Sequence, residues 1–195
     1  MVLKDPYNRT VTNLRISLTP RCNLRCIYCH AEGEVGPEEQ MSAEDIAELM
    51  RVGVQFGIKS IKFTGGEPLL RRDLVDIIRS VPQGVESSLT TNGTLLAAKA
   101  AELKEAGLAR VNVSLDTLRP ERYRQITGKD CLADVLVGID AAIEVGLTPV
   151  KLNMVLLEGI NEDELDDFMA FVRDKPDLIL QVIELMEFNE CKFHG

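Results

Sequence analysis

Short apolar runs recur along the chain, and longer amphipathic segments separate them. Between the runs, helical patterns of apolar positions occupy residues 42–56, 73–79, 94–106, 121–127, 132–145 and 161–173. The runs themselves are rich in aliphatic and β-branched residues and predict strands at 13–19, 60–64, 85–91, 110–115, 148–157 and 178–185. Strands that alternate with helices pair in parallel through right-handed crossovers, so this order predicts an α/β fold with a parallel sheet.

Polar residues occupy alternate positions within these strands. Arg15 lies between two aliphatic residues, and Lys62 lies between Ile61 and Phe63. Because side chains alternate between the faces of a strand, each strand has one polar and one apolar face. Parallel sheets covered on both faces have nearly continuous apolar strands instead, and a closed eight-stranded barrel needs about 250 residues. The pattern favours a partial (β/α)6 TIM-like barrel with parallel strands and a polar lumen; an open sheet with one solvated face is the alternative.

The composition excludes several classes of protein. Hydrophobic residues make up 45% of the 195 residues and charged residues 27%, which is typical of a globular domain and not of a disordered or fibrous chain. A net charge of −9 argues against a nucleic-acid partner. No apolar stretch approaches the roughly 20 residues of a spanning helix, and the first residues lack the apolar core of a signal peptide. We therefore expect residues 1–195 to form one domain with a cytoplasmic location.

Three of the five cysteines lie directly after the first predicted strand. Cys22, Cys26 and Cys29 have the spacing C-x3-C-x2-C. Thiolates select soft metals, and three of them on a short loop can hold three irons of a [4Fe–4S] cluster while the fourth iron takes a non-protein ligand. The alternative is a non-enzymatic zinc-binding module of the Cys3His type with His30. Because His30 is adjacent to Cys29, the two side chains are poorly placed to share one tetrahedral ion.

Two further features indicate ligand binding. The second strand ends in Thr-Gly-Gly-Glu-Pro, where the glycines permit close approach of the backbone and Glu67 offers a carboxylate suited to an ammonium group. The polar faces of the strands also carry Arg15, Lys62 and Lys151. Three cations facing one lumen in an acidic protein indicate a polyanion such as a triphosphate.

Together these motifs resemble those of the radical S-adenosylmethionine (SAM) superfamily. Six blocks are more closely similar to the GTP 3′,8-cyclase family of molybdenum cofactor biosynthesis: DPYNRTVTNLRISLTPRCNLRCIYC, IKFTGGEPLLRRDL, LTTNGTLL, GLARVNVSLDTL, VKLNMVLLEGIN and IELMEF. The resemblance implies conversion of GTP to (8S)-3′,8-cyclo-7,8-dihydroguanosine 5′-triphosphate through a 5′-deoxyadenosyl radical. It also implies an electron donor such as ferredoxin or flavodoxin, no membrane partner, and a homodimer as one option.

The same resemblance implies a role for each matching residue. Cys22, Cys26 and Cys29 would hold the [4Fe–4S] cluster. SAM would be contacted by Tyr28, Gly66, Glu67, Ser114, Asn153 and Met186. GTP would be contacted by Arg15, Lys62, Thr90 and Lys151, with Lys62 where the family commonly has arginine.

The chain departs from the family pattern in its remaining cysteines. The family has three further cysteines that bind a second [4Fe–4S] cluster, which holds the guanine of GTP. Cys131 and Cys191 have no C-x2-C partner, so we do not expect the second cluster from the residues present, and cyclisation by these residues alone is expected to be inefficient. A radical SAM enzyme that acts on a peptide or a tetrapyrrole is the alternative function.

Overall fold

The computed structural model describes residues 2–29 and 40–185. Its six strands are β1 (Asn13–Ser17), β2 (Ser60–Thr64), β3 (Glu86–Thr91), β4 (Arg110–Ser114), β5 (Val150–Leu156) and β6 (Leu178–Glu184). The α-helices are α1 (Ala43–Gln55), α2 (Leu74–Arg79), α3 (Leu96–Glu105), α4 (Pro120–Thr127), α5 (Leu132–Glu144) and α6 (Leu165–Arg173), with short 3-10 turns η1 (Pro68–Leu70) and η2 (Glu162–Glu164).

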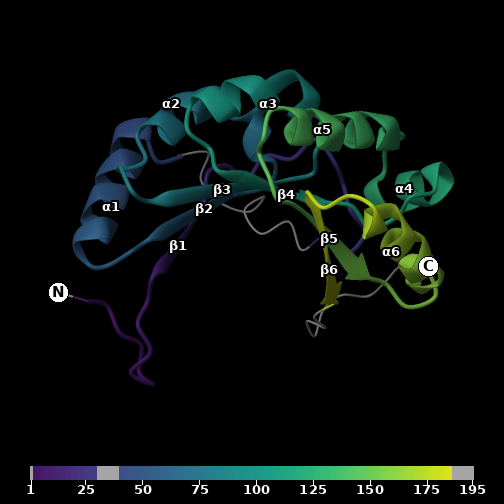
Figure 1. Cartoon of the computed structure of the whole chain (residues 1–195), viewed down its shortest axis with the longest axis horizontal. Coiled ribbons are helices and arrows are strands. Elements are labelled where there is room, and N and C mark those ends of the chain that lie inside the picture. Colours follow the sequence, from purple (N-terminus) through teal and green to yellow (C-terminus); the bar gives the residue numbers. More distant parts are fainter. Residues whose placement is uncertain (1, 30–39, 186–195) are drawn as a thin grey trace.

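The strands form one sheet in strictly sequential order, and every pairing is parallel. In a doubly wound sheet the order reverses at a switch point, which sends helices to both faces. Here the order never reverses, so right-handed crossovers keep the helices on one side. Figure 1 shows α1, α2, α3 and α5 arching over one face of the sheet. The predicted partial barrel of six parallel strands is therefore confirmed.

The hydrophobic core lies between this helical layer and the apolar face of the strands. Phe63 in β2, Leu89 in β3 and Val113 in β4 have no exposed surface, and neither have Ile46 and Met50 of α1. Burying one such side chain contributes about 1.5–3 kcal/mol. The two longest helices, α1 and α5, have 13 residues, and within the described chain no helix is long and apolar enough to cross a membrane.

The first helix begins where its sequence predicts. The Ser42 hydroxyl accepts a hydrogen bond from the Asp45 amide, and the Asp45 carboxylate accepts one from the Ser42 amide. This capping box satisfies amides that the first helical turn leaves without partners. It fixes the start of α1 and with it the return of the chain to the sheet after the cysteine loop.

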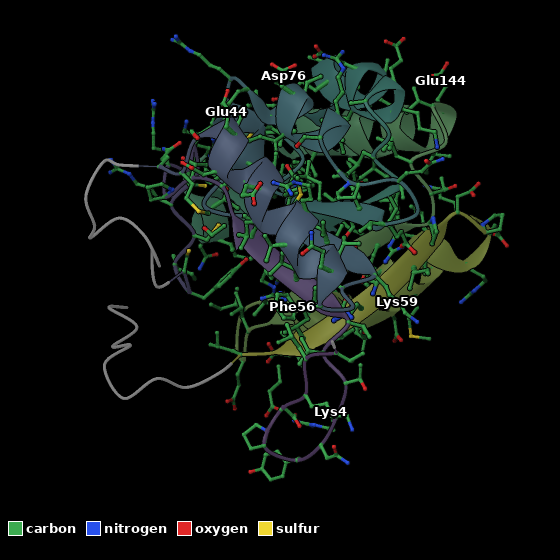
Figure 2. The ribbon with its side chains drawn as sticks, turned by 90° about the vertical axis from the view of Figure 1, so that its left-hand side faces the viewer. Lys4, Glu44, Phe56, Lys59, Asp76 and Glu144 are labelled. Atoms are coloured by element: carbon green, nitrogen blue, oxygen red, sulfur yellow. The ribbon has the colours of Figure 1, made fainter. Side chains whose placement is uncertain are left out.

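The N-terminal segment lies at the amino ends of the strands. The Leu3 amide donates to the Phe56 carbonyl, just after α1, and Lys4 forms an antiparallel bridge with Thr10. Figure 2 shows Lys4 below Phe56 and Lys59. The cysteines instead follow β1, so they lie at the carboxyl ends of the strands, where barrel enzymes bind their ligands.

Candidate functional site

The three cysteines lie close enough to influence one another electrostatically. Cys22 and Cys29 are exposed, Cys26 is half-buried, and none is in a disulfide. Burial, followed by the charges of Asp116, Cys29 and Cys22, raises the pKa of the Cys26 thiol to about 12. Burial also raises the pKa of Cys22. Without a metal, Cys22 and Cys26 therefore favour the neutral thiol, and a bound cation would favour the thiolates.

The cysteine loop has a first arm, residues 19–21, which packs against the glycine turn after β2, residues 65–67. The Gly66 amide donates to the Thr19 carbonyl at 2.7 Å, and the Glu67 amide donates to the Arg21 carbonyl at 2.8 Å. A Cβ atom on Gly65 would lie 2.5 Å from the Thr19 oxygen, and one on Gly66 would lie 2.5 Å from the Arg21 oxygen. The glycines are required because the two backbones meet with no space for a side chain.

The second arm of the loop, residues 25–28, is hydrogen-bonded to the end of α4 and to the loop after β4. The amides of Arg25 and Ile27 donate to the last carbonyls of α4 at 2.9 Å. The Tyr28 hydroxyl donates to the Asp116 carboxylate at 2.7 Å, and the Val155 amide donates to the same carboxylate at 2.8 Å. Burial raises the pKa of Asp116 to about 6. The Tyr28–Asp116 contact thus connects the cysteine loop to β4 and β5.

Arg71 joins the two ends of the chain segment that contains the cysteines. Its side chain is almost completely buried, and the guanidinium donates to the carbonyls of Leu18 and Met41, both at 2.8 Å. Asp73 accepts two further hydrogen bonds from it. One cation therefore holds residues 18 and 41 together and sets the base of the loop between them.

The structure corrects the predicted role of the Glu67 side chain. Glu67 has no exposed surface, and its carboxylate accepts hydrogen bonds from the Leu69 amide, the Thr91 hydroxyl and the Asn92 amide at 2.7–2.9 Å. A carboxylate without exposed surface, with three donors already bonded to it, is closed to a ligand in this structure, which argues against the predicted side-chain contact with SAM. Glu67 instead fixes the glycine turn against the end of β3, an arrangement that depends on partners 24 and 25 residues away.

Two predicted SAM contacts are neighbours in the sheet, and one lies outside the described residues. Ser114 in β4 is the register partner of Asn153 in β5, and both are half-buried. The Asn153 Oδ1 atom is buried and accepts no hydrogen bond within the described chain. Leaving such an acceptor unpaired costs about 1–3 kcal/mol, which a ligand donor at this position would offset. Met186 lies outside the described residues.

The predicted cations lie on the same face of the sheet, together with a fourth that the sequence reasoning missed. Arg15 is the register partner of Lys62, and the register of the following strands places Arg110 and Lys151 on the same face. Burial lowers the pKa of Lys62, and the charges of Arg15, Lys151 and Arg110 lower it further. Arg110 forms an ion pair with Glu86. The signal that could have found Arg110 is its alternation with Asn112 and Ser114 along β4.

Thr90 lies on this face as well. Its hydroxyl accepts a hydrogen bond from the Asn112 side chain at 3.2 Å, and Asn112 is 3% exposed. Because the hydroxyl acts as acceptor here, its own proton remains available to a ligand. The face thus combines repelling cations with a hydroxyl donor, which suits a polyanion.

The three cysteines fit an iron–sulfur cluster better than a single metal ion. Within residues 2–29 and 40–185, no three His, Cys, Asp or Glu side chains converge as a group for a single metal. In a cubane each thiolate binds a different iron, so three sulfurs of one short loop need not converge on one point. His30, the fourth ligand of the alternative zinc site, lies outside the described residues.

Comparison with known sequences adds two close relatives. Over 196 aligned residues the chain is 55% identical to a protein of Methanocella arvoryzae named Probable GTP 3′,8-cyclase, covering 100% of this chain and 64% of that protein. A protein of the same name from Archaeoglobus fulgidus is 55% identical over 191 residues, covering 96% of this chain and 64% of that one. The chain thus spans slightly less than two thirds of the length of these relatives.

Solved structures share the fold. Streptococcus suis SuiB bound to S-adenosylmethionine superimposes with a TM-score of 0.75 at 20% identity, over 92% of this chain and 42% of SuiB. The anSMEcpe protein with bound AdoMet superimposes with a TM-score of 0.72 at 21% identity, over 90% of this chain and 51% of that one. At these identities the likeness concerns the fold. The family model of the Radical SAM superfamily matches residues 16–172, and the chain therefore belongs to this superfamily.

Proposed function

We propose that this chain is the radical SAM portion of a GTP 3′,8-cyclase of molybdenum cofactor biosynthesis. The observation that carries the proposal is the 55% identity, over the whole chain, to a relative with that name. The cationic face supports it independently, since Arg15, Lys62 and Lys151 would pair with a triphosphate. A neutral peptide would leave these charges without partners.

The chain's residues would hold the cofactors at the carboxyl ends of the strands. Cys22, Cys26 and Cys29 would bind a [4Fe–4S] cluster, and Ser114 and Asn153 would contact SAM. When bound, the cluster and SAM supply the one-electron chemistry that removes a hydrogen atom from the substrate. The electron would come from a small carrier such as ferredoxin or flavodoxin in a reducing cytoplasm, and the unpaired state of the described cysteines suits that setting.

The cationic face would bind and orient the substrate. Charge-assisted contacts from Arg15, Lys62 and Lys151 to the phosphates would fix one end of GTP, and the Thr90 hydroxyl would donate to the same end. Lysine forms no bidentate contact, so Lys62 would act as a point charge. Phosphate binding would also relieve the repulsion that, in addition to burial, lowers the pKa of Lys62. The role of these residues is thus to place the ribose near the bound SAM.

Calorimetric titration of GTP into the reconstituted, SAM-loaded chain tests the proposal. Arg15→Ala and Lys151→Ala should each weaken binding by roughly ten- to hundred-fold, because each contact is worth about 1.5–3 kcal/mol. Arg79→Ala removes the same charge from the outer surface of α2, where the side chain is 56% exposed, and should leave affinity unchanged. Equal GTP affinity in the parent chain, Arg15→Ala and Lys151→Ala would contradict the proposal. Mass spectrometry of the products with reductant present distinguishes the cyclised nucleotide from SAM cleavage alone.

A further inference from the structure

Asn92 is the first residue after β3, and it contacts the cysteine loop. Its side-chain amino group donates to the side-chain oxygen Oδ1 of Asn23 at 2.8 Å and to the Cys22 sulfur at 3.9 Å. Asn92 is 69 and 70 residues away from these partners in the sequence. The contact therefore forms because the parallel sheet brings the ends of β1 and β3 to the same edge.

Three side chains form a closed cycle of hydrogen bonds that fixes the orientation of the Asn92 amide. Asn92 Nδ2 donates to Asn23 Oδ1, Asn23 Nδ2 donates to Thr94 Oγ1 at 2.9 Å, and Thr94 Oγ1 donates to Asn92 Oδ1 at 2.8 Å. The Thr94 backbone amide also donates to Asn92 Oδ1, at 3.1 Å. A flipped Asn92 amide would place its amino group against the Thr94 amide donor. The amino group consequently faces Cys22.

The backbone of Asn92 is held equally firmly. Its amide donates at 2.7 Å to the buried Glu67 carboxylate, which also accepts from the Thr91 hydroxyl. The glycine turn that includes Glu67 is itself bonded to the first arm of the cysteine loop through the Arg21 carbonyl. Asn92 is thus bonded to the glycine turn directly, and Cys22 is connected to it through the preceding residue, Arg21. These backbone bonds and the side-chain contacts together determine the position of Asn92 relative to Cys22.

We propose that Asn92 is a positioning residue for the cluster, which orients Cys22 and donates a hydrogen bond to its thiolate. Hydrogen bonds to the sulfurs are among the features that set the reduction potential of an iron–sulfur cluster. An N–H donor stabilises the reduced, more negative state, so it shifts the potential in the positive direction. Cys22 would therefore differ from Cys26 and Cys29 in its electronic environment. The inference depends on superfamily membership and not on GTP as substrate.

The test uses the full chain, reconstituted anaerobically with ferrous iron and sulfide and studied without SAM or GTP. Asn92→Asp keeps the shape and the oxygen that accepts from Thr94, but it replaces the amino donor with a carboxylate oxygen. Asn92→Ala removes the whole amide. Thr94→Val is the control, because it breaks two bonds of the same cycle while the Asn92 amino group and the Thr94 backbone amide remain.

We expect both Asn92 variants to have a more negative cluster potential and an altered electron paramagnetic resonance spectrum, with the larger shift in Asn92→Asp. Iron should also be lost to a chelator more readily, because loss of a residue that supports a metal ligand typically weakens metal affinity by about 10–100-fold. Thr94→Val should resemble the parent chain in potential. Loss of the cluster in an Asn92 variant that circular dichroism shows to be folded, with the cluster retained in Thr94→Val, would also support the proposal. An unchanged potential in both Asn92 variants, or an equal shift in Thr94→Val, would overturn it.

Discussion

Replacing Gly66 with alanine tests whether the glycine turn determines the position of the cysteine loop. The added Cβ atom would lie 2.5 Å from the Arg21 carbonyl oxygen and 2.6 Å from the Pro20 carbonyl oxygen. Since Cβ contacts below 3.0 Å essentially do not occur, one backbone must move by at least about 0.5 Å. Over-packing of this kind typically lowers the free energy of unfolding by about 1–3 kcal/mol. A displacement of ~1 Å at the cysteines would lower the rate of SAM cleavage by on the order of a hundred-fold.

The matched control is Gly53→Ala in α1. Its added Cβ atom would lie 3.4 Å from Ile58 Cγ1, an ordinary contact, and alanine favours the helix. Urea unfolding of the metal-free chain, iron content after reconstitution and SAM cleavage are measured for both variants. Gly53→Ala should equal or exceed the parent chain in stability and match it in iron content. If Gly66→Ala does the same, the packing argument is refuted. If Gly66→Ala loses only SAM cleavage, Gly66 acts on SAM directly.

Three further predictions concern the site and its support. Cys26→Ala should abolish cluster assembly, measured as iron per chain, whereas Cys131→Ala should not; equal damage by both would contradict the ligand assignment. Because the pKa of Asp116 is raised from 3.8 to about 6, the folded state binds more protons than the unfolded state between these values, and this contribution to stability is lost as pH rises through about 6. Urea midpoints of the metal-free chain from pH 4 to 7 should therefore fall less steeply with rising pH in Asp116→Asn, and identical slopes would refute the assignment. Glu164→Ala should lower the free energy of unfolding by about 1–3 kcal/mol, since it leaves the buried Thr117 hydroxyl and the Leu118 amide without their acceptor while Arg122 keeps its ion pair with Asp163; urea unfolding equal to that of the parent would contradict this.

The local pattern of apolar and polar residues was sufficient to predict the helices and strands, and to assign a polar and an apolar side to each strand. The alternation of Arg15 and Lys62 with aliphatic residues identified the polar face, because side chains of a strand alternate irrespective of its neighbours. The spacing of Cys22, Cys26 and Cys29 predicted a cluster loop for a similar reason, since residues on one short loop are neighbours in any fold. The family resemblance added the predicted SAM and GTP contacts, which no short-range pattern contains.

Tertiary structure alone decided the surroundings of these residues. The sequence suggested that Glu67 was a free carboxylate, but the meeting of β2 with β3 encloses it among donors 24 and 25 residues away. Asn92 reaches Cys22 across 70 residues, and Asp116 accepts from Tyr28 across 88. Arg110 joins the cationic face through the register of β4 with its neighbours. Periodicity determines which side of a strand a residue occupies, but hydrogen-bond partners depend on which strand ends lie side by side, and that is a property of the assembled sheet.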